Sequence, residues 1–214
     1  ANTTGPRNTA VGYSSLSANT TGDNNTAVGE NSGLATTTGA NNTFLGQDAG
    51  EANTGGSTNT VVGSDALQAS TTSNYQTALG YQALYSSVTH SVNADAYNVA
   101  VGHYAMKGLT TGIRGTAVGA FALDATVTGN DNTAVGYSAA TAISTGGYNT
   151  AIGSAALGTL STGSNNTAIG YYALGLASDT SSNTGLGHYA GGAISTGNFN
   201  TAIGALAGDA ITTG

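Results

Sequence analysis

A five-residue block, Asn-Thr-Ala-Val-Gly, recurs along the whole chain at almost constant spacing. It stands at residues 8–12 and 25–29, and variants of it continue to residues 200–204. With the first residue of each block as origin, twelve origins follow at 17-residue steps, apart from one gap of 22 between Gln76 and Asn98. A fixed period indicates repeats that each pack on their neighbours. We therefore treat residues 1–214 as a single repeat domain.

The length and composition of the repeat select its fold class. Seventeen residues are too few for two-helix repeats, which need about 33 or more. The Thr-Ala-Val segment alternates its side chains as a strand does, and β-branched residues favour that conformation. Gly, Asn and Thr-Gly are turn residues. We predict an all-β, parallel β-solenoid of twelve 17-residue turns, each with a short strand, a turn, a second short extended segment and a return turn. At about 4.8 Å per turn the rod is on the order of 58 Å long.

Columns of equivalent residues indicate what each position does. The fourth residue of the block is aliphatic and the fifth is Gly in all twelve repeats. We expect the aliphatic column to fill a thin core, the Asn column to hydrogen-bond along the stack, and the Gly column to mark a bend or a close backbone approach. The Thr shares the side of the aliphatic residue, so we expect it to be hydrogen-bonded inside or to sit at the rim. Representative members of these structural columns are Asn8, Val11, Gly12, Asn25, Val28, Gly29, Asn149, Ile152 and Gly153.

Composition excludes several function classes. Only 6% of the residues are charged and the formal net charge is −7, whereas nucleic-acid binding needs clustered Lys and Arg. No apolar run approaches the ~20 residues of a membrane span, so we expect no direct membrane insertion. Without cysteine there is no disulfide and no thiolate zinc site.

The residues capable of catalysis or metal binding are sparse. His90, His103 and His188 have no metal-ligand spacing, and we interpret them as exposed polar residues. Asp48 and Asp65 share one column, but no column of acids runs along the repeats, and surface charges are the favoured interpretation. We predict no catalytic residue, no metal site, no cofactor and no enzyme activity.

Aromatic residues concentrate in the two positions that follow the Gly. Such a stripe suits contact with carbohydrate or protein. The alternative is that stacked rings simply stiffen neighbouring turns. The candidate ligand-contact residues are Tyr13, Tyr81, Tyr104, Phe121, Tyr137, Tyr171, Tyr172 and Tyr189.

The one irregular spacing places a five-residue insertion within about residues 86–95. A protruding loop on a regular scaffold is a place where function is often found, and a neutral bulge is the equal alternative. The candidate loop residues are Ser87, Val88, Thr89, His90, Ser91 and Val92.

The thin core predicts assembly. Each repeat offers about two large aliphatic side chains, worth roughly 1.5–3 kcal/mol each on burial, against an ordering cost of ~1–2 kcal/mol per residue. We expect a homo-oligomer whose copies run parallel around a common axis. The chain begins with "ANTTG" and finishes with "AITTG", the same phase of the repeat. This favours a segment of a longer fibre or a subunit that stacks end to end.

The repeat unit also carries a family resemblance over the whole chain. The stretches QTALGYQALYS at 76–86 and NTAIGYYAL at 166–174 carry it best. The unit resembles the head repeats of trimeric autotransporter adhesins and the "NTAIG" repeats of tail-fibre-like proteins of bacteria and their phages. The resemblance implies a left-handed parallel β-roll of three chains, exported and used as an adhesive or spacing fibre. The period of 17 is longer than the adhesin head unit.

These observations favour an extracellular structural or adhesive fibre segment at a cell surface or in a virion fibre, with copies of itself as partners. A glycan or a cell-surface receptor is the expected external partner. The alternative is a self-stacking filament subunit without its own receptor. Ice binding, which uses flat Thr arrays on solenoids, is less favoured because the same-face neighbour of each repeat Thr is aliphatic. A carbohydrate-processing enzyme is also disfavoured, because charge is sparse and no column of carboxylates exists.

Overall fold

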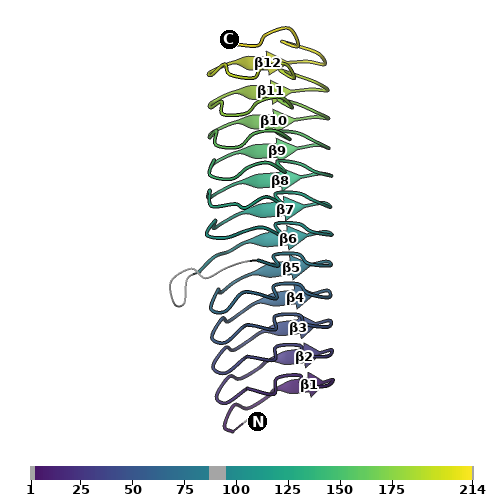
Figure 1. The fold of residues 1–214 in the computed structure, drawn as a ribbon, viewed down its shortest axis with the longest axis vertical. Helices are drawn as coiled ribbons and strands as arrows, with labels where there is room; N and C mark the ends of the chain where they lie inside the picture. Colours follow the sequence, from purple (N-terminus) through teal and green to yellow (C-terminus); the bar gives the residue numbers. More distant parts are fainter. Residues whose placement is uncertain (1–2, 87–94, 214) are drawn as a thin grey trace.

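The chain coils into a straight rod with one short strand per repeat (Figure 1). The computed structural model describes residues 3–86 and 95–213. Each strand has three residues and coincides with the second to fourth residues of the sequence block. The strands are β1 (Thr9–Val11), β2 (Thr26–Val28), β3 (Thr43–Leu45), β4 (Thr60–Val62), β5 (Thr77–Leu79), β6 (Val99–Val101), β7 (Thr116–Val118), β8 (Thr133–Val135), β9 (Thr150–Ile152), β10 (Thr167–Ile169), β11 (Thr184–Leu186) and β12 (Thr201–Ile203). We number each repeat after its strand.

The strands form one parallel sheet in sequence order, with like residues paired. Thr9 lies opposite Thr26, and the same register continues to β12. Across the 22-residue spacing Thr77 still pairs with Val99, so the insertion does not shift the register. The predicted parallel β-solenoid and its period are confirmed, while the left-handed winding implied by the resemblance stays a prediction. No helix in the described part of the chain is long and apolar enough to cross a membrane.

The direction of the strand side chains corrects one prediction. The middle residue is buried in every strand except the terminal β1, and the first and third residues point outward. The aliphatic column therefore does not fill the core: Val11 is 57% exposed and Ile152 is 38% exposed. The interior of the coil is narrow, since the hydroxyl of Ser32 reaches the carbonyl oxygen of Phe44 in the opposite wall at 3.0 Å. A small middle residue fits there, and the larger aliphatic residue takes the outer face.

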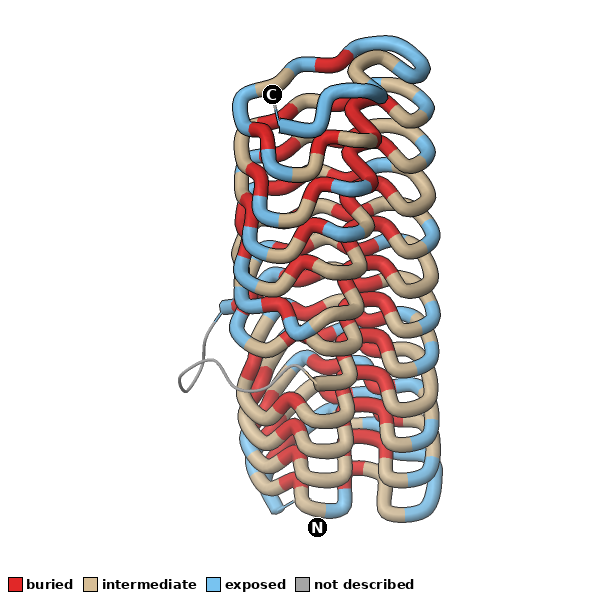
Figure 2. Tube along the Cα trace, turned by 45° about the horizontal axis from the view of Figure 1, so that its top comes forward, coloured by how far each residue is buried: buried red, intermediate tan, exposed pale blue. Residues whose placement is uncertain are grey.

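Small residues and a leucine column make the core instead. The residues three and four positions after the conserved Gly are buried in most repeats and face the strand from the opposite wall. Buried residues form continuous columns along the rod (Figure 2). A third column, seven positions after the Gly, is polar in repeats 1 to 4 and mostly apolar from repeat 6 onward. Its members include Asn19, Thr36, Asn53, Ser70, Leu109, Ile143, Leu160 and Ile194.

Phe44 shows how tightly the two walls are matched. It is the one large residue in the Ala column, and it is fully buried. Its ring covers Gly33 and Gly50, which replace leucine in the facing column, and a Cβ built on Gly33 would lie 2.9 Å from Phe44 Cδ2. The extra volume in one wall thus offsets the volume missing from the other.

The segment after the Gly is also not the extended segment that we predicted. It is a run of turns, in which the residues two and four positions after the Gly have positive φ in every repeat. Tyr172 and Leu174 are examples, at φ 54° and 49°. Backbone hydrogen bonds still join these turns between repeats, as from the Leu157 amide to the Ala173 carbonyl at 3.1 Å. Left-handed residues let the chain reverse within four positions, which a strand cannot do.

The Asn column forms the expected ladder. The side-chain oxygen of Asn149 accepts from the Asn166 backbone amide at 3.0 Å, and its nitrogen donates to the Gly163 carbonyl at 2.9 Å. The same pair of bonds recurs at Asn25 and Asn42. Each of these Asn side chains thus satisfies the amide that begins the next repeat and a carbonyl of the turn before it, which would otherwise be unpaired in the interior.

The Gly column has both of the properties that we predicted. These glycines have φ between 118° and 138°, a conformation that side-chain-bearing residues rarely adopt. A Cβ built on Gly102 would lie 2.6 Å from the carbonyl oxygen of Gly119 in the next repeat. The chain therefore bends at this column, and neighbouring backbones stack there in close contact.

Candidate functional site

The outer face of the sheet carries the largest regular surface of the rod. We define the outer sheet face as the first and third residues of the twelve strands. Leu45, Leu79, Leu186 and Ile203 of this face are between 43% and 66% exposed. None of the strand residues is charged. A contiguous exposed apolar stripe of this kind is unusual on a lone soluble chain and marks an interaction surface.

Threonine forms the second column of the outer sheet face. Thr43 and Thr60 are exposed, and the remaining members are exposed or half-buried, with Val99 as the one substitution. The prediction that this Thr lies on the side of the aliphatic residue is confirmed, but both columns face outward. The sheet therefore presents hydroxyl and aliphatic groups side by side in strict register.

Five of the aromatic residues after the Gly column meet in repeats 5 to 8. We call Tyr81, His103, Tyr104, Phe121 and Tyr137 the central aromatic cluster. The rings of Tyr81 and His103 are stacked with centroids 5.5 Å apart, and Phe121 meets Tyr137 edge-on at 5.8 Å. Tyr104 lies between Tyr81 and Phe121, with its ring centroid 5.6 Å from that of Tyr81 and 5.5 Å from that of Phe121. These distances are those of stabilising aromatic pairs.

The same arrangement returns in repeats 10 and 11. We call Tyr171, Tyr172, His188 and Tyr189 the C-terminal aromatic cluster. Tyr171 stacks on His188 at 5.5 Å, and the ring of Tyr172 lies 5.0 Å from that of Tyr189. Tyr13 belongs to repeat 1 and lies outside both clusters, although it is 77% exposed. The predicted contact residues thus form two clusters and one separate residue.

Two tyrosines of these clusters, Tyr81 and Tyr189, have a raised pKa. Desolvation raises the pKa of Tyr81, and the neighbouring Tyr104 and Asp65 raise it further. A side-chain hydrogen bond to Tyr171 raises the pKa of Tyr189, and desolvation adds to this. These phenols therefore act as aromatic surfaces and hydrogen-bonding groups and are not nucleophiles at neutral pH.

Three of the acidic residues, Asp48, Asp65 and Asp131, are held by side-chain amides or by an arginine. The amide nitrogen of Asn31 donates to Asp48 at 3.0 Å, and that of Gln82 donates to Asp65 at 3.2 Å. Arg114 makes an ion pair with Asp131 at 2.7 Å, and this hydrogen bond lowers the pKa of the Asp131 carboxyl. No group of three or more His, Cys, Asp or Glu side chains in the described ranges is placed to hold a metal ion.

The insertion and two histidines were further candidates from the sequence. The insertion residues Ser87 to Val92, with His90 among them, lie outside the described residues. His103 and His188, which we interpreted as exposed polar residues, are exposed and also belong to the aromatic clusters. Their position in the same column as Tyr81 and Tyr171 was the available signal.

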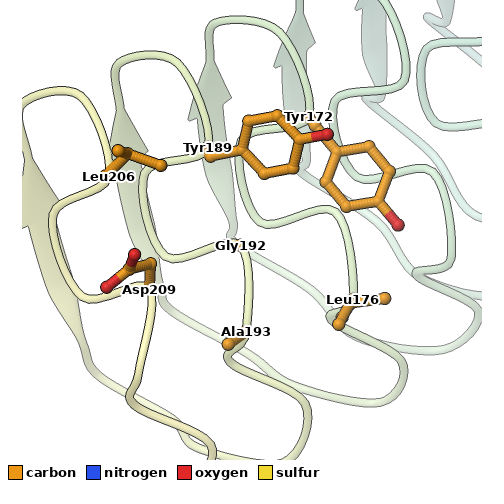
Figure 3. Close-up of a pocket in the computed structure, with 7 residues that line it drawn as sticks. All are labelled: Tyr172, Leu176, Tyr189, Gly192, Ala193, Leu206 and Asp209. Carbon is orange, nitrogen blue, oxygen red and sulfur yellow. The ribbon is translucent and has the colours of Figure 1, made fainter.

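Sequence reasoning missed two further features. Tyr75 and Tyr97, which precede the Asn column, stack with centroids 4.9 Å apart beside the insertion. A pocket also lies next to the C-terminal aromatic cluster, between repeats 10 and 12 (Figure 3). The signal for this pocket was a run of glycines five positions after the conserved Gly, at Gly158, Gly175 and Gly192.

Comparison of the chain with protein-family models, curated proteins and solved structures finds no match in any of the three.

Proposed function

We propose that the chain is a structural segment of an extracellular fibre, in which parallel copies pack through the outer sheet face and expose the aromatic clusters. The observation that carries this proposal is the exposed aliphatic column of the sheet. Its exposure in a single chain, with Val118 at 37% and Leu79 at 45%, leaves apolar surface in water along the whole rod. Packing against further copies removes this surface from water, and burial of apolar area is the main driving force of association.

The size and charge of the face suit such packing. Twelve strands at about 4.8 Å and three residues at about 3.3 Å give a face of roughly 500 Å². Two such faces bury roughly 1,000 Å², the lower bound for a specific interface. The ten acidic residues all lie outside the strands, so two copies bring no like charges together there. A rotation axis along the rod pairs every repeat with its own equivalent in the neighbouring copy.

The number of copies and the outward role follow the resemblance described above. We propose three copies, with a cell-surface or virion location and left-handed winding, on the basis of that resemblance. The aromatic clusters lie beyond the bend at the Gly column, outside the sheet, where rings are free to contact a glycan or a receptor. End-to-end stacking, which would pair β12 of one copy with β1 of the next, is the competing assembly.

Ice binding is a second candidate for the same face. The aliphatic same-face neighbour of each repeat Thr, which disfavoured ice binding in the sequence, is also present in the structure. What favours it is that regular columns of Thr and aliphatic residues lie together on the outer sheet face. Ice binding by this face and packing of copies through it exclude each other, because a face buried between copies cannot contact ice. Thermal hysteresis of a monomeric sample would favour the second candidate, and its absence would remove it.

Charge placed on the outer sheet face tests the proposed function. We expect Val118→Lys with Ile152→Lys to separate the copies, because two buried ammonium groups per chain would lack partners. The control pair is Thr145→Lys with Asn165→Lys, at exposed positions off the sheet face. The proposal requires the first pair to lower the molar mass to 20.7 kDa with an unchanged circular dichroism spectrum. An unchanged mass for both pairs would contradict it.

A further inference from the structure

The pocket beside the C-terminal aromatic cluster has features of a small binding site. It has a volume of about 220 Å³ and is mostly apolar. Tyr172 and Tyr189 form one wall, and Gly192 and Ala193 form part of the floor (Figure 3). Its volume is below the ~300–1,000 Å³ of pockets for drug-sized ligands, so it has room for one compact group.

The pocket exists because glycine occupies one position in two consecutive repeats. The fifth residue after the conserved Gly is Gly175 in repeat 10 and Gly192 in repeat 11. The ring of Tyr172 lies where a side chain on Gly175 would begin, and a Cβ on Gly192 would lie 3.3 Å from Tyr189 Cδ1. Absence of these side chains leaves the tyrosine rings accessible from the side of the turn.

The equivalent position in repeat 6 shows that a cation can lie over the tyrosine of this column. Lys107 is the fifth residue after its Gly, and Tyr104 is the second, as Tyr172 is in repeat 10. The Lys107 ammonium lies 4.1 Å from the centroid of the Tyr104 ring, a cation–π contact. The chain therefore places its own cation over the tyrosine in repeat 6 and has no side chain at the matching position of repeats 10 and 11.

The remaining lining residues complete the match to a cation. Asp209, the fifth residue after its Gly in repeat 12, places a carboxylate at the pocket, and the chain carries a net charge of −7. Leu176 and Leu206 supply apolar surface near the two rings. A quaternary ammonium combines positive charge with apolar methyl groups. A primary ammonium would lose its bound water here, and its N–H donors would find no hydrogen-bond acceptor on the leucines.

We propose that this pocket binds a quaternary ammonium group, of the trimethylammonium type found in choline head groups. The tyrosine rings contact the cation, the Asp209 carboxylate compensates its charge, and the leucines contact its methyl groups. The inference deepens the proposed function, because it names the ligand class for one part of the outward aromatic surface, and it rests on that surface being exposed in the fibre.

The test uses the whole chain and choline chloride, with binding followed by saturation-transfer NMR of the methyl protons at constant ionic strength. The matched probe is 3,3-dimethylbutan-1-ol, which has the same shape without the charge. We expect choline to bind with Kd of about 1 mM and the neutral alcohol to bind at least roughly fivefold more weakly. Equal binding of the two probes, or no binding of choline at about 50 times the expected Kd, would each overturn the proposal.

Variants localise the site. We expect Asp209→Asn and Tyr189→Leu each to weaken choline binding roughly two- to fivefold, and Tyr189→Phe to retain it because the ring remains. Tyr137→Leu, in the central aromatic cluster, is the matched control. Unchanged binding in Tyr189→Leu with a native circular dichroism spectrum would overturn the assignment. Molar mass is measured on the same samples, so that loss of assembly and loss of choline binding are recorded separately.

Discussion

The backbone amide of Asn149 donates a hydrogen bond to the side-chain oxygen of Asn132, one repeat earlier, at 3.0 Å. Asn132 in turn donates from its side-chain nitrogen to the Gly146 carbonyl at 2.8 Å. One amide side chain thus joins the start of the next repeat to its preceding turn. Because each repeat contacts only its neighbours, these bonds contribute directly to the stability of each interface along the rod.

Replacement of a ladder residue should therefore destabilise the rod. In Asn149→Ala, the Asn166 amide and the Gly163 carbonyl lose their partners inside the protein. We expect the free energy of unfolding to fall by about 2–4 kcal/mol, measured by urea titration. Gln47→Ala, which removes an exposed amide, is the control and should change it by less than about 0.5 kcal/mol. Equal effects of the two substitutions would show that the ladder contributes nothing specific.

The ladder has a weak point at repeat 5. Gln76 takes the Asn position there, and both of its side-chain amide atoms are buried without a hydrogen-bond partner in the described part of the chain. Gln76→Asn should restore the ladder geometry and raise the free energy of unfolding by about 1–2 kcal/mol. Gln47→Asn makes the same change of length at the surface. A lower unfolding midpoint for Gln76→Asn would mean that the longer side chain is required beside the insertion.

Phe44 and the glycines that it covers make a second stability test. Phe44→Ala should cost about 3–5 kcal/mol, because its ring fills the interior of repeats 2 and 3. Gly50→Leu alone should destabilise, since its Cβ would overlap the Phe44 ring. In the Phe44→Ala background the same Leu should stabilise by about 1–2 kcal/mol, as Leu67 and Leu84 occupy the same column with similar φ.

A urea double-mutant cycle measures this coupling. Additive effects of Phe44→Ala and Gly50→Leu would contradict the idea that the two walls exchange volume.

The period, the strands and their register were predictable from the sequence because the repeat spacing is so regular. The Gly column was predictable because few residues other than glycine adopt its positive φ. The Asn column was predictable because few side chains can hydrogen-bond to backbone groups of two repeats. The direction of the strand side chains was not predicted correctly. Alternation leaves two phases open, and we assigned the larger residue Val11, not Ala10, to the interior. Asn8 and Ala10 are two residues apart, so the ladder and the small core share one side of the chain; this was the overlooked signal.

The candidate surfaces were predictable only in part. The column position of Tyr81 and Tyr171 indicated their outward direction, and both are more than 40% exposed. Their grouping with His103 and His188 depends on which repeats carry rings consecutively. The pocket depends on the absence of side chains at Gly175 and Gly192, and on an acid, Asp209, at the same position of the following repeat. No single motif encodes this combination.

The molar mass of the unmodified chain in solution tests the central claim most directly. The account holds that the exposed aliphatic column of the outer sheet face is covered by further copies. Light scattering coupled to size-exclusion chromatography should give about 62 kDa for three chains of 20.7 kDa each. Very large, polydisperse species would favour end-to-end stacking. A stable monomer of 20.7 kDa at micromolar concentration would contradict the account.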